Sequence, residues 1–217
     1  MLRTIGVAVA GVFLLTSIAL GQDNRYDVSV NGGAVFTSTS TGNGTTLTPT
    51  KSGDVLLTAR YRFAERSSFE LNFAHTANSQ IYFASPLTYR IMNTINEYSG
   101  AYVFSFLQSK TLEPFVFAGA GAMVFYPGYD FNTINGVQAY LPATQQTRPA
   151  FLYGAGFDWR VFSRVPFVRR SGITDFLAVR LQYRGLLYKA PDFNVQNLFT
   201  GERSHMAEPT IGIVVKF

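Results

Sequence analysis

Cysteine is absent from the 217-residue sequence, and charged residues make up only 14% of it. The lack of cysteine excludes disulfide cross-links, thiolate metal sites and a lipid anchor attached to a cysteine. The charges sum to +5, and the basic residues are scattered rather than gathered in a stripe with aromatic residues. We therefore do not expect nucleic acid as a partner.

Long apolar runs are also missing after residue 21. A membrane-spanning helix needs about 20 consecutive apolar residues. If the rest of the chain lies in a membrane, it must therefore cross as a closed β-barrel, which also satisfies its own backbone groups. No repeat with a period of roughly 20 to 50 residues divides the chain, so residues 22–217 are predicted to form one domain.

The first residues have the pattern of an export signal. Arg3 is followed by an apolar run at 5–20, and small residues occupy the −3 and −1 positions before Gln22. This predicts a secretory signal peptide, residues 1–21, that is cleaved between Gly21 and Gln22. The alternative is an uncleaved membrane anchor, but the apolar run of about sixteen residues is short for a spanning helix.

The remaining chain alternates between amphipathic segments and polar connections. Successive side chains of a strand point to opposite faces, so a period of two in the apolar residues predicts a strand. Eight segments are predicted as strands, and all but 114–126 show this period: they lie near residues 26–36, 54–63, 68–77, 95–107, 114–126, 151–161, 177–187 and 209–217. Four long connections, near 39–53, 79–93, 127–148 and 189–204, alternate with three short ones, at 64–67, 108–113 and 163–173. The predicted fold is all-β: an eight-stranded antiparallel up-and-down transmembrane β-barrel.

The polar face of these segments carries charges of both signs. Export, together with aromatic residues near the strand ends, favours lipid on the apolar face and the lumen on the polar face. Charges shielded from water need partners, so we predict a paired network inside the barrel. Its members are Asp27, Asp54, Arg60, Arg62, Glu70, Glu97, Asp158, Arg160, Arg180, Arg184, Glu208 and Lys216. The segment 114–126 is apolar on both faces, so its facing stays open. A soluble lipocalin-like barrel, with the apolar face inside, is the alternative.

The last nine residues show the pattern most clearly. Ile211, Ile213, Val215 and Phe217 share one face of a strand that stops on an aromatic residue. This resembles the terminal assembly signal of bacterial outer-membrane β-barrels. Together with the strand rhythm and the Gly-Ala-Gly-Ala run at 119–122, it makes the chain similar to the small eight-stranded barrels of the OmpA-like and opacity-like porin types.

That resemblance implies an outer-membrane location, contact with outer-membrane lipid and lipopolysaccharide, and folding through the barrel-assembly machinery. OmpA-like proteins often continue into a peptidoglycan-binding domain. We do not expect one here, because the sequence stops at its last predicted strand.

No catalytic, cofactor-binding or metal-binding set is predicted. His75 and His205 lie in different segments, and neither has a serine two residues later, as the lipid A deacylase barrels do. Metal binding needs convergent ligands, which the two histidines and the scattered carboxylates do not supply. We expect no enzymatic activity and no cofactor. A lipid-modifying role for one of the histidines is a weaker alternative.

An eight-stranded barrel is just wide enough for side chains to fill it. We therefore expect a largely plugged polar lumen, with a structural or surface-interaction role for the loops. The longest loop, 127–148, adds Tyr129, Phe131 and Tyr140 to the adjacent Tyr126, and these rings could hold a partner or a surface glycan. A narrow ion or solute channel is the main alternative.

Overall fold

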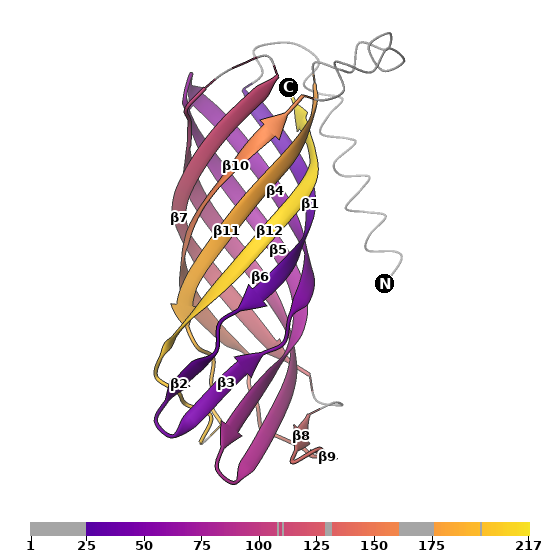
Figure 1. The fold of residues 1–217 in the computed structure, drawn as a ribbon, viewed down its shortest axis with the longest axis vertical. Helices are drawn as coiled ribbons and strands as arrows, with labels where there is room; N and C mark the ends of the chain where they lie inside the picture. The colour runs from indigo at the N-terminus through magenta and orange to yellow at the C-terminus, as the bar shows by residue number, and fades with distance from the viewer. Residues whose placement is uncertain (1–24, 108, 110, 129–131, 161–175, 196) are drawn as a thin grey trace.

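The computed structural model describes residues 25–107, 109, 111–128, 132–160, 176–195 and 197–217. These residues form a closed antiparallel β-barrel (Figure 1). In this part of the chain, no helix is long and apolar enough to cross a membrane. The predicted signal peptide and its Gly21–Gln22 cleavage site lie outside the described residues.

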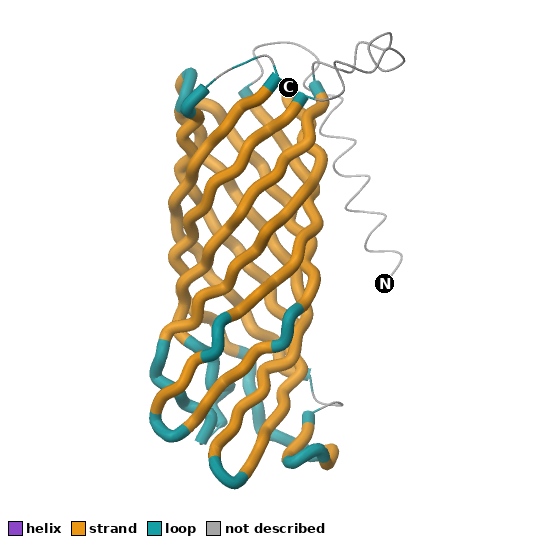
Figure 2. Tube along the Cα trace, in the orientation of Figure 1, coloured by secondary structure: helices purple, strands orange, loops and turns teal. Residues whose placement is uncertain are grey.

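Eight long strands make the wall, and each pairs antiparallel with the next. They are β1 (Tyr26–Thr37), β4 (Ser52–Ala64), β5 (Ser67–Ala84), β6 (Leu87–Ser105), β7 (Leu112–Pro127), β10 (Gln146–Trp159), β11 (Leu177–Lys189) and β12 (Arg203–Lys216). Pairing of β12 with β1 closes the ring (Figure 2), so none of the eight is left with an unpaired edge along the wall. The predicted eight-stranded antiparallel barrel is confirmed.

The two ends of the barrel differ. The first strand begins and the last strand ends at the same end, close to the tight β4–β5 turn (Figure 1). We call this the turn end and the opposite one the loop end. Strand lengths run from 12 residues in β1 to 19 in β6, whereas a membrane strand needs about nine to eleven.

The extra length of β5 and β6 corrects one expectation. Residues 79–93 were predicted to be a long loop, but the two strands stay paired up to Ala84 and Leu87. The period of two continues through this stretch, because Gln80 and Tyr82 are buried and Phe83 is exposed. Pro86 lies in the two-residue turn at the tip, so it does not interrupt the pairing.

Two other predicted loops contain short strands. Residues 39–53 hold β2 (Ser40–Gly42) and β3 (Thr45–Pro49), and β3 pairs with β5. Residues 127–148 hold β8 (Thr133–Ile134) and β9 (Val137–Gln138), and β8 pairs with β6. Both hairpins turn on an Asn-Gly pair, at 43–44 and 135–136, with positive φ at all four residues. Asn and Gly adopt this conformation readily, which suits a two-residue hairpin.

Candidate functional site

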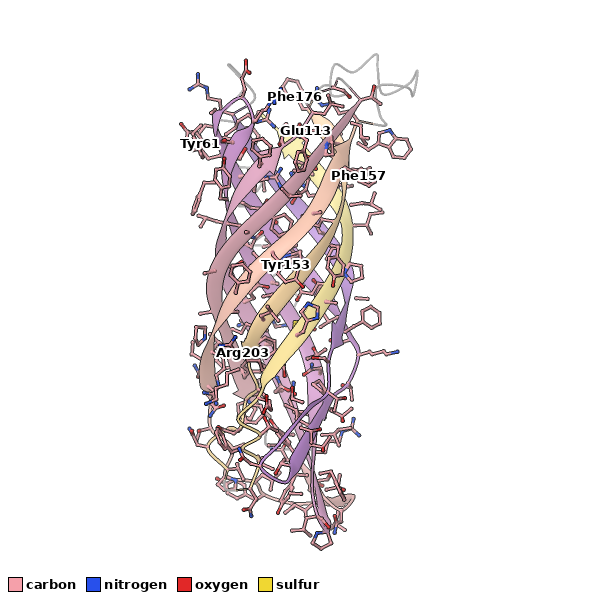
Figure 3. The ribbon with its side chains drawn as sticks, turned by 60° about the vertical axis from the view of Figure 1, so that its left-hand side comes forward. Tyr61, Glu113, Tyr153, Phe157, Phe176 and Arg203 are labelled. Carbon is pink, nitrogen blue, oxygen red and sulfur yellow. The ribbon has the colours of Figure 1, made fainter. Side chains whose placement is uncertain are left out.

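The outer surface of the barrel wall is apolar. Val30, Leu71 and Ile213 are each about half exposed on it. Tyr61 lies near the turn end (Figure 3), where Trp159 also ends β10. Apolar side chains therefore face outward, and the lipocalin-like arrangement with the apolar face inside is wrong.

The interior also contains aromatic residues from β7, the strand whose facing the sequence left open. Phe115 and Phe117 are buried in the lumen, whereas Val116 between them faces out. Glycines of the neighbouring β10 make room for both rings. A Cβ atom on Gly154 would lie 2.4 Å from Phe117 Cζ, and one on Gly156 would lie 2.8 Å from Phe115 Cζ.

Eight buried or half-buried charged residues fill the lumen toward the turn end, and we call them the basal cluster. Arg180 is fully buried and donates from Nε to Asp158 Oδ1 (2.7 Å) and from Nη2 to Asp27 Oδ1 (3.1 Å). Lys216 Nζ lies 2.7 Å from Asp158 Oδ2 and 2.8 Å from Glu113 Oε2. The full set is Asp27, Arg60, Arg62, Glu70, Glu113, Asp158, Arg180 and Lys216. Four carboxylates thus meet four cations, which compensates the cost of burying them.

A second group, the mid-lumen cluster, consists of Asp54, Glu97, Arg184 and Glu208. Arg184 is fully buried and bridges Glu97 Oε1 (2.5 Å) and Glu208 Oε2 (2.7 Å). Asp54 is buried too, and in the described chain neither of its carboxylate oxygens has a hydrogen-bond partner. Three carboxylates therefore share one cation, so this cluster lacks the charge balance that was expected of the network as a whole.

The observed charge network differs from the predicted one at two residues. Arg160 lies past the end of β10, where its N–H donates to Thr111 O (2.9 Å), and it is only half-buried. Glu113 was assigned to a connection, yet it belongs to β7 and contacts both Arg62 and Lys216. Glu113 lies two residues before Phe115 and therefore on the same face of β7. The inward facing of this strand, which the sequence did not reveal, is what places Glu113 in the lumen.

The lumen toward the loop end is filled by apolar side chains, which we call the loop-end core. They come from the strands and from the 190–202 connection: Met123, Phe125, Leu152, Leu186, Tyr188, Phe193, Leu198 and Met206. Phe193 is fully buried and meets Phe125 edge-on, with ring centroids 6.4 Å apart. This connection was predicted to be a polar loop, and its apolar residues were the signal that sequence reasoning missed.

Polar contacts hold the same connection in the mouth of the barrel. Tyr82 donates its hydroxyl to Pro191 O (2.8 Å), and Gln146 Oε1 accepts the N–H groups of Asp192 and Phe193 (3.0 Å each). Arg148 Nη2 lies 3.2 Å from Asp192 Oδ2. Partial burial opposes ionisation of Asp192, but hydrogen bonds from its surroundings outweigh it and lower the pKa of its carboxyl below the usual 3.8.

The ring nitrogens of the two histidines contact an amide and a phenol in the described chain, and the backbone N–H of His205 donates to Ser38 Oγ (2.9 Å). His75 Nδ1 is 2.8 Å from Asn96 Oδ1, and His205 Nε2 is 2.9 Å from Tyr153 OH. Neither ring forms a hydrogen bond with a serine hydroxyl or a carboxylate of the described residues. The described residues also contain no group of three or more His, Cys, Asp or Glu side chains placed to hold a metal ion.

No protein-family model matches the sequence, and no curated protein matches it. Solved structures do resemble the fold. Neisserial surface protein A is similar with a TM-score of 0.54 and 14% identity, over 91% of this chain and 99% of that one. OprG, an outer membrane protein of Pseudomonas aeruginosa, is similar with a TM-score of 0.58 and 13% identity, over 89% and 96%. The chain has the fold of a small outer-membrane β-barrel.

In an outer-membrane barrel the short turns are periplasmic and the long loops extracellular. The turn end therefore corresponds to the periplasmic side of such barrels, and the loop-end core to the extracellular side. Tyr126 and Tyr140 are exposed, Tyr140 by 77%, whereas Tyr129 and Phe131 lie outside the described residues.

Three residues of the predicted assembly signal lie on the outer side of β12, and Phe217 directly follows this strand. Ile211 and Ile213 are more than half exposed, and Val215 and Phe217 are half-buried. Their role in assembly stays a prediction.

Proposed function

We propose that this barrel is a non-conducting outer-membrane protein that acts through its extracellular surface, in a structural or surface-interaction role. The filled lumen supports the first part of the proposal. Two charged clusters and the loop-end core occupy it in series, and Arg180, Arg184 and Phe193 have no exposed surface. An ion crossing the barrel would have to displace buried, paired charges, which is costly.

The extracellular part of the sheet supports the proposed role of the surface. There β5 and β6 continue as a paired hairpin, with β3 added on one side and β8 on the other. Such pairing makes a stiff platform, whereas most surface loops are mobile. Phe83 is exposed on this platform, and Val137 of β9 and Tyr140 after β9 are exposed beside it. Exposed aromatic residues are common in binding surfaces.

Conductance tests the plugged lumen against the channel alternative. We expect purified wild-type barrels in a planar bilayer to give no steady current. A variant in which residues 192–198 are replaced by a short Gly-Ser linker should give higher leakage, because it removes Phe193 and Leu198 from the mouth. Regular unitary currents from the wild type would favour a narrow ion or solute channel instead.

A shortened hairpin tests the role of the platform. Replacing residues 79–92 by an Asn-Gly turn removes the paired extension but leaves the membrane-spanning parts of β5 and β6. Bacteria displaying the wild type or this variant would be compared on a glycan array and in an autoaggregation assay. We expect the wild type alone to bind or aggregate. Equal behaviour of both strains would contradict a surface role for this hairpin.

We also propose that the barrel is not an enzyme. The ring contacts of His75 with Asn96 and of His205 with Tyr153 support this, because neither ring nitrogen forms a hydrogen bond with a serine hydroxyl that it could activate. Lipid A composition in cells expressing the wild type or the His75→Ala/His205→Ala variant should be identical. A modified lipid A species that is lost in the variant would overturn this view.

A further inference from the structure

One site on the outside of the barrel is not accounted for by a plugged lumen or by the platform. Lys189 of β11 and Arg203 of β12 are directly opposite each other in the sheet register, and both are exposed. Like charges placed opposite each other on one sheet face are destabilising. In the described chain no carboxylate forms an ion pair with either residue; the ammonium of Lys189 lies only over the ring of Phe199, at 4.9 Å.

The surrounding wall makes this pair more unusual. Every carboxylate carried by the eight barrel strands, from Asp27 in β1 to Glu208 in β12, is buried on the lumen side. The charged side chains that the strands carry on their outer surface near the extracellular end are therefore all cationic, although Glu202, in the connection just before Arg203, is exposed as well. A bound anion from outside the chain would remove the repulsion that this arrangement leaves.

The height of the pair on the barrel identifies where such an anion would come from. At about 3.4 Å per residue and a tilt of about 40°, the outward-facing stretch from Trp159 to Phe151 rises about 21 Å along the barrel axis. Phe151 is paired with Leu187, and Lys189 lies two residues further on. Hydrogen-bonded neighbours on strands tilted in this way also differ by about 3 Å in height. Lys189 in β11 thus lies about 29 Å and Arg203 in β12 about 32 Å above the periplasmic aromatic side chains, just beyond an apolar band that is typically about 25 Å tall. Figure 3 shows Arg203 toward the extracellular end of the wall.

The shape of the surface fits an amphiphile rather than a free anion. Lys189 and Arg203 line a groove of about 660 Å³ together with Phe151 and Leu187. The two apolar side chains lie on the membrane side of the two cations. A ligand that fills the groove would present hydrocarbon below and negative charge above.

We propose that the groove between β10, β11 and β12 binds a phosphorylated glycolipid of the outer leaflet, with its headgroup phosphate between Lys189 and Arg203. Its acyl chains lie along Phe151 and Leu187. Guanidinium and ammonium groups bind phosphate strongly in such partly dehydrated positions. This site is independent of whether the lumen conducts.

Native mass spectrometry of the folded, detergent-solubilised barrel tests the site, with diphosphoryl hexa-acyl lipid A as the probe. We expect the wild type to retain one lipid A molecule, and the Lys189→Gln/Arg203→Gln variant to bind it at least tenfold more weakly. The matched control, Lys51→Gln/Arg90→Gln, removes two other exposed cations near the extracellular end and should bind like the wild type. Dephosphorylated lipid A and free pyrophosphate should each bind at least tenfold more weakly than lipid A.

Other results would each overturn the proposed site. Unchanged lipid A binding by the Lys189→Gln/Arg203→Gln variant, or equal loss in the control variant, would overturn the site in favour of general charge attraction. Equal binding of pyrophosphate would show that the groove takes a soluble anion, and equal binding of dephosphorylated lipid A would show that only the apolar part matters. Heat-modifiability on a gel verifies that each variant is folded. If the double variant does not fold, the single Lys189→Gln and Arg203→Gln variants take its place, with Lys189→Arg as the charge-conserving control.

Discussion

Tyr26 and Phe217 exchange two main-chain hydrogen bonds, of 2.9 and 2.8 Å, and their rings stack with centroids 6.2 Å apart. The first residue of β1 thereby meets the residue that follows β12, at the periplasmic end of the seam that closes the barrel. This contact gives a structural role to a residue that the sequence pattern assigns to an assembly signal. The two roles can be separated by experiment.

Deleting Phe217 should reduce the folded fraction several-fold in cells. It removes two hydrogen bonds at the seam, each contributing about 1 kcal/mol, as well as the aromatic terminus. Phe217→Ala keeps the backbone bonds and loses the ring, with its stacking on Tyr26, so it separates the contribution of the backbone from that of the ring. Heat-modifiability in membrane fractions measures the folded fraction. If both variants fold like the wild type, neither role is supported.

Arg184→Met should destabilise the barrel by about 3–5 kcal/mol, because Glu97 and Glu208 would be left buried without their cation. Adding Glu97→Gln and Glu208→Gln to the same chain should recover most of that loss. Urea unfolding of the barrel in lipid vesicles measures both effects. A triple variant that is no more stable than Arg184→Met would show that the packing of Arg184, rather than charge compensation, is what matters.

Gly154→Val should destabilise the barrel by about 1–3 kcal/mol, because its Cβ would lie 2.2 Å from Tyr183 O and 2.4 Å from Phe117 Cζ. Combining it with Phe117→Ala should cost less than the sum of the two single changes. The control is Gly32→Ala, whose added Cβ would meet its nearest atom at 3.9 Å and should change stability by no more than about 0.5 kcal/mol. Strict additivity in the same unfolding assay would contradict the proposed contact.

Acid should loosen the 190–202 connection. The pKa of Asp192 is lowered in the folded barrel, so its ionised form stabilises the folded state above the ordinary value of 3.8, and this contribution is lost as pH falls through the lowered pKa. We expect pepsin to cleave after Phe193 or Leu198 increasingly fast below about pH 4. Asp192→Asn lacks the titrating group and corrects for the activity of pepsin at each pH. Parallel pH profiles for the two proteins would rule out Asp192 as the cause.

The barrel itself could be predicted from the sequence because the alternation of side chains along a strand is a local property. The strand rhythm predicted the number of strands, and the inward position of Asp27, Arg60 and Glu70 follows from the same period. Residues 79–93 were misjudged because Pro86 and the polar residues around it are also typical of loops. Pairing between β5 and β6 outweighed that local signal.

Tertiary structure decided everything that depends on which strands meet. The sequence determined that charges line the lumen, but only closure of the ring brought Arg180 of β11 to Asp27 of β1 and left Asp54 without a hydrogen-bond partner in the described chain. The facing of β7, apolar on both sides, was decided by glycines of its neighbour β10. Phe193 entered the lumen because the aromatic rings of other strands could bury it there. Periodicity is encoded within a segment, whereas packing and charge pairing depend on segments far apart in the chain.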